Sequence, residues 1–246
     1  MDRLVYVAMS GAKEILRAQA ANNHNLANAS TNGFRADMSA FQTQEVVGAG
    51  LHSRAYATSD SVGWDSTSGS LEATGRDLDV AVKGAGWLAV QASDGSEAYT
   101  RAGDLRVDPT GVLTTASGLP VLGDSGPVTI PPSSSITIGG DGTVSVVPRG
   151  QQVKTISTVG RIKLVNPAAA DLERGTDGLF RLRAGGAAPA DASVQLVSGT
   201  LEGSNVNIAE TMTNMIELSR NYDLQIKAMK AAEDNDAASS KLLQGA

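Results

Sequence analysis

The chain has 246 residues, of which 41% are hydrophobic, so it is long enough for one or two domains with a buried core. Its formal net charge of −6 gives no basic surface for nucleic acid, and the lack of cysteine excludes disulfides, iron–sulfur clusters and thiolate metal sites. Aromatic residues make up only 4% whereas glycine occurs 27 times, a composition that suits short strands joined by tight turns.

A helix is predicted over residues 1–34. Apolar and small residues recur there with alternating spacings of three and four, the heptad pattern of helices that pack against other helices. A polar asparagine in such a stripe costs stability but fixes the register and the number of partners. The predicted stripe consists of Val5, Ala8, Ala12, Ile15, Gln19, Asn22 and Leu26.

Residues 35–68 are polar and predict an extended connector, after which the period of the pattern changes to two. Residues 69–200 are therefore expected to form a β-rich middle domain. Asp-Gly and Asp-Pro-Thr-Gly sequences within it are typical of tight turns. Short strands are predicted at 78–82, 87–90, 98–100, 112–114, 136–138, 143–147, 156–165 and 194–196.

A second helix is predicted over residues 201–246, with Asn207 and Glu210 as a capping pair at its start. At about 57 Å it would be too long for a compact domain of this size, so it needs a partner along its length. The stripe runs from Ile208 to Leu243, and its apolar members up to Met229 are Ile208, Met212, Met215, Tyr222, Ile226 and Met229. The sequence thus predicts an α+β fold, in which the N- and C-terminal helices form a coiled-coil-like helical domain beside a β-rich middle domain.

Two arrangements of these helical stripes remain open. The helices can form a hairpin within one chain that packs onto the β-rich middle domain, or they can bundle with helices of other copies. The first stripe favours bundling, because its alanine and asparagine side chains would bury little apolar area against a sheet. Residues 1–34 carry three basic and two acidic side chains, and residues 201–246 carry four basic and seven acidic ones. The two ends can therefore attract each other or the ends of neighbouring copies.

No catalytic, metal-binding or cofactor-binding residue is predicted. His24 and His52 are the only histidines, and neither has the sequence surroundings of a catalytic triad. Gly84-Ala85-Gly86 follows a predicted strand but lacks the third glycine of a dinucleotide-binding loop. The sequence contains no run of about 18 apolar residues, so no membrane span is predicted. The first ten residues lack the pattern of a cleaved secretory signal.

Three stretches resemble the bacterial flagellar axial family of rod, hook and hook-associated proteins. Residues 69–87 and 99–103 are similar to the start of the family's β-rich domain. His24 stands where the N-terminal signature of the family usually has asparagine. The residues that match that signature are Asn25, Leu26, Ala27, Asn28, Gly33 and Phe34. The residues that match the C-terminal signature are Leu201, Glu202, Ser204, Asn205 and Val206.

The resemblance implies a structural subunit of the flagellar basal-body rod, and the opening residues favour its proximal part; the distal rod protein or another axial subunit is the alternative. Both helical stripes would form the polymerisation interface of the axial drive shaft and export channel. The implied partners are further copies, other rod proteins (FlgC-like below, FlgG-like above) and the flagellar type III export apparatus. The resemblance implies no enzymatic activity, cofactor, nucleic acid or direct membrane span. The implied location is the periplasmic rod, reached without a cleaved signal peptide.

Overall fold

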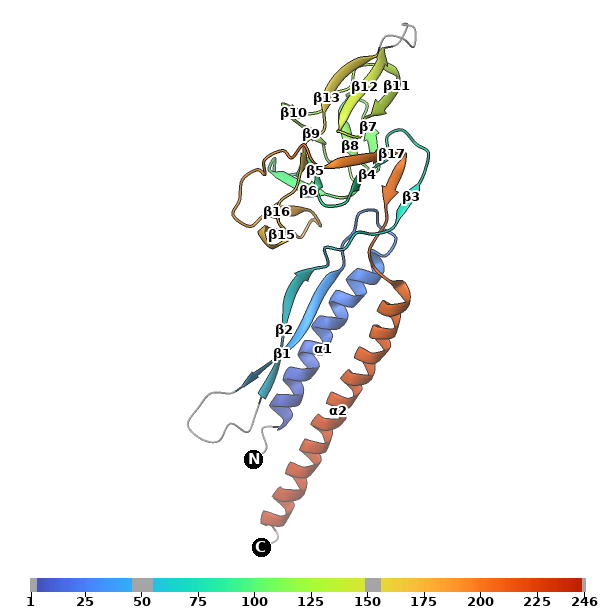
Figure 1. The fold of residues 1–246 in the computed structure, drawn as a ribbon. Helices are drawn as coiled ribbons and strands as arrows, with labels where there is room; N and C mark the ends of the chain where they lie inside the picture. Colours follow the sequence, from blue (N-terminus) through green and yellow to red (C-terminus); the bar gives the residue numbers. More distant parts are fainter. Residues whose placement is uncertain (1–3, 46–54, 149–155, 245–246) are drawn as a thin grey trace. The chain divides into compact units, whose positions relative to one another are not determined.

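The structure is a computed structural model that describes residues 4–45, 55–148 and 156–244. The contacts between its segments divide the chain into two compact units (Figure 1). Unit 1 consists of Met1–Ala29, Ala36–Asp65 and Val206–Ala246, and unit 2 consists of Ser30–Arg35 and Ser66–Asn205. The architecture is α+β as predicted, with the two helices in unit 1 and a β-rich unit 2.

Unit 1 contains the helices α1 (Leu4–Ala27) and α2 (Ile208–Gln244) and the strands β1 (Asp37–Glu45) and β2 (Ala55–Trp64). The described elements of unit 2 are β3 (Leu71–Ala73), β4 (Val80–Lys83), β5 (Trp87–Gln91), β6 (Glu97–Thr100), β7 (Leu105–Val107), β8 (Leu113–Thr115), β9 (Leu122–Gly123), β10 (Gly126–Pro127), β11 (Ser133–Ile138), β12 (Thr143–Pro148), β13 (Ser157–Arg161), β14 (Leu164–Val165), the 3-10 helix η1 (Ala169–Asp171), β15 (Leu172–Arg174), β16 (Phe180–Leu182), β17 (Gln195–Ser198) and β18 (Thr200–Glu202).

Within unit 1, α1 and α2 lie side by side, and the antiparallel hairpin of β1 and β2 lies along α1 (Figure 1). The segment 35–68, expected as an extended connector, therefore contains a two-stranded sheet, with a register shift between Met38 and Ser39. Its strands are rich in serine, threonine and alanine, so their sequence shows little alternation of apolar and polar residues. This composition explains why the hairpin was not predicted.

The ends of the helices follow from local hydrogen bonds. The Asn207 side-chain oxygen accepts hydrogen bonds from the backbone N–H groups of Ala209 (3.1 Å) and Glu210 (3.3 Å), so Asn207 caps α2 as predicted. Helix α1 ends earlier than the predicted boundary at 34, because residues 30–35 belong to unit 2. Neither described helix combines the length and apolar character needed to cross a lipid bilayer.

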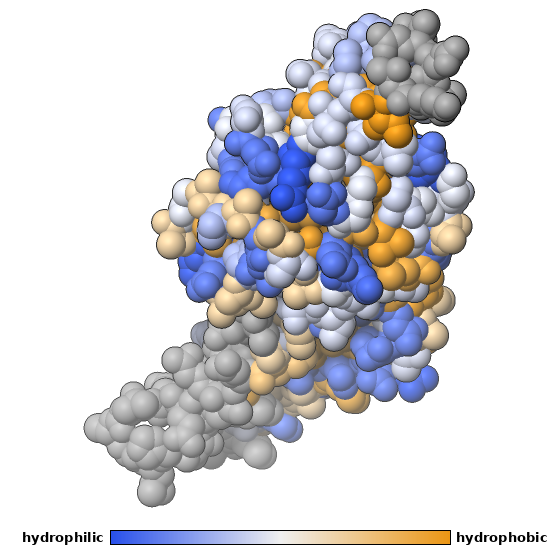
Figure 2. Space-filling model, turned by 45° about the horizontal axis from the view of Figure 1, so that its top comes forward, coloured by the Kyte–Doolittle hydropathy of each residue, from blue (hydrophilic) through white to orange (hydrophobic). Residues whose placement is uncertain are grey.

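Unit 2 contains a five-stranded antiparallel sheet, in the order β14-β5-β6-β16-β15, and a three-stranded sheet, β11-β12-β13. The pairs β3–β18 and β4–β17 join the beginning of the β-rich segment to its end. Its core consists of aliphatic side chains that include Val80, Leu88, Leu105, Leu113 and Val144. Figure 2 shows polar residues over much of the visible surface of unit 2, with apolar residues between them.

Four tight turns of unit 2 share one arrangement around an aspartate. The serine or threonine two positions after it donates both its hydroxyl, at 2.6–2.7 Å, and its backbone N–H, at 2.8–3.1 Å, to the carboxylate. These bonds, the side-chain bond first, hold the pKa of each carboxyl group below its ordinary value of 3.8. The four residues are Asp94, Asp108, Asp141 and Asp191.

A lowered pKa in the folded state makes the stability of unit 2 depend on acid pH. We expect this stabilisation to be complete above about pH 4 and to be lost as the pH falls through the lowered pKa values, where the carboxylates become protonated. Asp141→Asn keeps an acceptor in its turn but cannot titrate, so the melting temperature of this variant should fall less steeply between about pH 4 and pH 2. If the melting temperatures of the variant and of the unchanged chain fell equally steeply over this pH range, the Asp141 carboxylate would not contribute to the pH dependence.

Candidate interaction surfaces and a buried ion cluster

The stripe predicted on α1 lies on the side of the helix that α2 and the hairpin cover. Ala8, Ala12, Ile15 and Asn22 are buried in the single chain. The other members, Val5, Gln19 and Leu26, are half-buried. These residues therefore already pack inside one chain, and their contact with another copy stays a prediction.

The stripe predicted on α2 is divided between two surroundings. Met215, Tyr222 and Met229 are half-buried, whereas Ile208, Met212 and Ile226 are 52%, 54% and 42% exposed. The side of α2 that is turned toward α1 also follows spacings of four and three. It comprises Thr211, Met215, Leu218, Tyr222, Gln225, Met229 and Ala232. The sequence indicated the neighbouring stripe because polar Thr211 and Gln225 occupy the covered side, while larger apolar residues remain outside.

Two contacts fix how α1 and α2 lie along each other. The Asn22 side-chain amide donates to the backbone carbonyl of Thr211 at 2.8 Å, and Asn22 is buried. A side chain added at Gly11 would meet the Gln225 side chain at 3.2 Å, so the two helices are close at this point. A buried amide that must find its partner allows one alignment of the helices, which is the role predicted for an asparagine in the stripe.

Asn25 connects the end of α1 to strand β1. Its side-chain amide donates to the backbone carbonyl of Asp37 (2.9 Å), and its side-chain oxygen accepts from the Asp37 N–H (2.8 Å), as a neighbouring strand would. His24 Nδ1 lies 2.6 Å from the Asp37 carboxylate, and the Asn28 amide donates to the His24 carbonyl at 2.9 Å. This part of the N-terminal signature therefore positions the hairpin; His52 lies outside the described residues.

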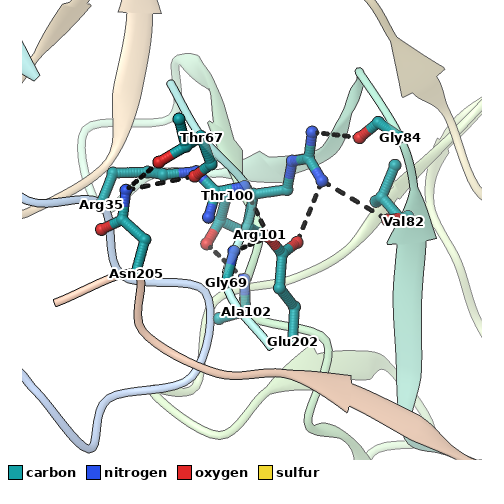
Figure 3. Close-up of polar contacts among 10 residues, drawn as sticks. All are labelled: Arg35, Thr67, Gly69, Val82, Gly84, Thr100, Arg101, Ala102, Glu202 and Asn205. Carbon is teal, nitrogen blue, oxygen red and sulfur yellow. Dashed lines mark hydrogen bonds and ion pairs between the residues drawn. The ribbon is translucent and has the colours of Figure 1, made fainter. Parts of the chain in front are cut away.

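A buried ion cluster lies in unit 2 (Figure 3). Arg35 Nη2 donates to Glu202 Oε1 at 2.6 Å, and Arg101 Nη1 donates to Glu202 Oε2 at 2.9 Å; the three side chains are 0–4% exposed. The backbone N–H of Gly69 also donates to Glu202 Oε1, at 3.0 Å. Arg101 Nη2 donates to the carbonyl of Gly84 at 2.7 Å. Burial holds the pKa of the Arg101 guanidinium below its ordinary value, although the Glu202 carboxylate opposes this shift. The guanidinium nevertheless stays charged, as arginine does in proteins.

The loop 30–35 is held in unit 2 beside this cluster. The Gly33 N–H donates to the backbone carbonyl of Glu202 (2.7 Å), and the Asn205 N–H donates to the carbonyl of Phe34 (3.3 Å). The guanidinium carbon of Arg174 lies 4.5 Å from the centre of the buried Phe34 ring, a cation–π contact. The end of the N-terminal signature thus belongs structurally to the β-rich unit.

The remaining signature residues lie close to these contacts. Leu201 pairs with Glu72 in the ladder between β18 and β3, and the Asn205 amide donates to the Thr67 carbonyl at 3.1 Å. Ser204 and Val206 are half-buried and lead toward α2, while Leu26 is half-buried and Ala27 exposed at the end of α1. Sequence reasoning singled out Glu202 but not its partners, because Arg101 and Arg35 lie 101 and 167 positions away along the chain.

Comparison with known proteins defines the class of this fold. Residues 81–146 match the domain family described as flagellar hook protein FlgE/F/G D1 domain, and residues 197–242 match flagellar basal body rod FlgEFG protein C-terminal. The chain is thus one of the flagellar rod and hook proteins. It is 44% identical to FlgF of Escherichia coli (strain K12) and 45% identical to FlgF of Salmonella typhimurium (strain LT2), over 99% of each chain. It is 30% identical to FlgG of Bacillus subtilis (strain 168), over 95% of this chain and 96% of that one.

The chain belongs to the FlgF family of flagellar basal-body rod proteins, which confirms the family expected from the sequence motifs. The matched C-terminal region covers most of α2 together with the end of unit 2. The structural role of the relatives agrees with the expectation of a rod subunit.

Proposed function

We propose that this chain is a subunit of the proximal rod, which polymerises through unit 1 into the axial drive shaft and its export channel. The observation that carries this proposal is the apolar stripe left open on α2. Ile208, Met212, Ile216 and Ile226 all expose between 42% and 56% of their surface. Large apolar residues that follow one side of a helix over several turns mark a surface that another helix covers.

The family relations support the position in the rod. Identity to the FlgF relatives from Escherichia coli and Salmonella typhimurium is 44–45%, against 30–34% to the FlgG relatives from Bacillus subtilis and Buchnera aphidicola. The proposed neighbours are further copies of this chain, a FlgC-like subunit below and a FlgG-like subunit above. The proposal includes a periplasmic location and passage through the flagellar type III export apparatus without a cleaved signal peptide.

The buried ion cluster suggests how unit 2 takes part in this role. The segments around Arg35, Gly69 and Glu202 all lie next to places where the chain passes between unit 1 and unit 2. The Arg35 and Glu202 segments are tied into unit 2 by a buried ion pair, and the Gly69 segment by a part-buried hydrogen bond to Glu202. Load that the helices carry would therefore reach unit 2 through three anchored segments, which suits a part of a rotating shaft.

Met212→Asp tests the polymerisation surface. Met212 is 54% exposed in the single chain, so an aspartate there stays hydrated and the unfolding of the free subunit should hardly change. In the assembled rod the same charge would be buried without a partner, which costs several kcal/mol, so rod completion and swimming should be lost. The variant should be compared with the unchanged chain by thermal unfolding, by its presence in isolated basal bodies and by motility in soft agar.

Thr213→Asp is the matched control for this experiment. It adds the same charge one residue further along α2, on an exposed position outside the apolar stripe. Motility should be close to normal with Thr213→Asp. Normal swimming with Met212→Asp, or equal defects with both variants, would show that the stripe is not the polymerisation surface.

A further inference from the structure

Helix α1 carries a second stripe on the side that α2 and the hairpin leave open. Its residues follow the spacing three, four, three, four, three, four, one position away from the covered stripe, and all of them are exposed. The three large apolar side chains, Tyr6, Met9 and Leu16, are 60%, 53% and 49% exposed. The full stripe is Tyr6, Met9, Lys13, Leu16, Ala20, Asn23 and Ala27.

This open face of α1 is basic as well as apolar. Lys13 belongs to the stripe, and Arg17 lies one helical turn further on the same side. Arg17 contacts Glu14 at 3.0 Å, yet its side chain is still 57% exposed. A partner for this face must therefore cover apolar side chains and bring negative charge to the level of Lys13 and Arg17.

The far end of α2 has that charge. Helix α2 is covered as far as Ala232, which is 1% exposed, and the residues 233–241 beyond it are all exposed. This stretch begins with Glu233, Asp234 and Asp236, and its first basic residue is Lys241. Among the residues that the structure describes, no other helix of the same chain covers this acidic segment at the end of α2.

The acidic segment cannot reach the basic face of its own chain. Gly11 lies level with Gln225 and Asn22 with Thr211, so the helices are antiparallel and Lys13 and Arg17 lie near the level of residues 218–222. Asp234 lies about 14 residues beyond that level, or about 21 Å along the helix axis. That separation is more than twice the distance of about 8 Å over which salt screens charges under physiological conditions.

We propose that the acidic end of α2 in one copy lies along the basic, apolar face of α1 in a second copy, displaced by about 21 Å along the helix axis. This inference rests on the proposed polymerisation through unit 1 and names its second contact surface. The two surfaces are different, so the contact is heterologous, and its repetition adds copies in one direction. Opposite charges at the two surfaces align the copies and disfavour other displacements.

The size of the contact explains when it forms. Helix α1, with 24 residues, offers at most a strip about 36 Å long and about 10 Å wide, and the acidic segment 233–241 spans only about 14 Å of it. The contact therefore buries well under half of the about 800 Å² per partner that a stable pair of proteins buries. One such contact does not hold two free copies together. We therefore expect free subunits to be monomeric and the contact to form in the rod, where each copy meets several neighbours.

A pair of introduced cysteines tests the displacement directly, because the natural chain contains no cysteine. Lys13→Cys with Asp234→Cys places two thiols too far apart for a disulfide within one chain, since a disulfide needs Cα atoms within about 7 Å. After mild oxidation of isolated basal bodies, this variant should give covalently linked copies that separate on reduction. The control pair, Lys13→Cys with Glu217→Cys, moves the second thiol about 26 Å back along α2 and should give none.

Charge reversal provides the second measurement. Lys13→Glu should reduce incorporation into basal bodies at least about tenfold, and adding Asp234→Lys to the same chain should restore it, since the attraction is then reversed but intact. Cross-links in the control pair only, or no rescue by the second reversal, would overturn the proposed contact. Absence of the unsubstituted chain from basal bodies would instead overturn the proposed function, so the two failures are distinguishable.

Discussion

Glu202→Gln should lower the free energy of unfolding of unit 2 by about 3–5 kcal/mol, the usual cost of removing one partner from a buried ion pair. Glu202 is the one acid that faces both Arg35 and Arg101 in this cluster, and all three side chains are buried. An uncharged amide would leave two guanidinium groups inside unit 2 without compensating charge. Denaturant titration followed by tryptophan fluorescence, to which the buried Trp87 of unit 2 contributes, measures the loss.

Glu72→Gln is the matched control for this stability measurement. Glu72 lies on β3, directly across the ladder from Leu201, and it is exposed. The same chemical change in the same two-stranded sheet should alter stability by less than about 0.5 kcal/mol, as surface substitutions usually do. Equal effects of the two substitutions would show that water screens the cluster.

We expect the cluster to contribute more to the specific geometry of unit 2 than to its net stability. Among the described residues, Arg35 Nε, Arg35 Nη1 and Arg101 Nε find no hydrogen-bond acceptor, so the burial of these charges is only partly compensated. Apolar residues of similar volume often replace a whole buried ion cluster without loss of stability. Apolar residues would not provide the specific contacts through which Glu202 brings together the segments around Arg35, Gly69 and Arg101.

The parts of the fold that local sequence determines were predicted well. Asn207 caps α2 as expected. Strands were expected where β5, β6 and β12 lie, because an apolar run marks β5, alternating residues mark β12, and Asp-Gly turns precede β6 and β12. The hairpin of β1 and β2 was not expected, since its small and polar residues lack this alternation. The predicted helix 1–34 ends earlier, at Ala27, because the Asn, Ser, Thr and Gly residues that follow are poor helix formers and residues 30–35 bind into unit 2.

For the candidate surfaces, too, the sequence pattern alone did not show which individual residues are covered. Heptad spacing identified α1 and α2 as helices that pack against helices, yet it fitted two adjacent stripes on each helix. Polar Thr211 and Gln225 lie on the covered side of α2, whereas apolar Met212 is exposed. Hydrophobicity alone therefore could not tell the side that meets α1 from the side left open. The ion pairs of Glu202 with Arg35 and Arg101 could not be predicted either, because these arginines are 167 and 101 positions away along the chain.

Gly33→Ala should be among the most damaging single-methyl changes in this protein. Gly33 has a φ of +69°, where a residue with a side chain is strained by about 1–2 kcal/mol. In addition, the new Cβ would lie 2.3 Å from the backbone carbonyl carbon of Arg101, which cannot yield as a flexible side chain does. The loop 30–35 would have to leave its place, and Phe34 and Arg35 would leave the core of unit 2 with it.

Gly75→Ala separates these two causes, because Gly75 has nearly the same φ, +72°, but no atom within 4 Å of the new Cβ. It should cost only the backbone strain of about 1–2 kcal/mol. Gly33→Ala should cost at least about 2 kcal/mol more, within the range found when buried contacts are broken. Denaturant titration compares the two variants, and faster hydrogen exchange at Gly33 and Arg35 in Gly33→Ala alone would locate the damage. Equal losses in both variants would mean that the docked loop does not depend on the close approach of Gly33 to Arg101.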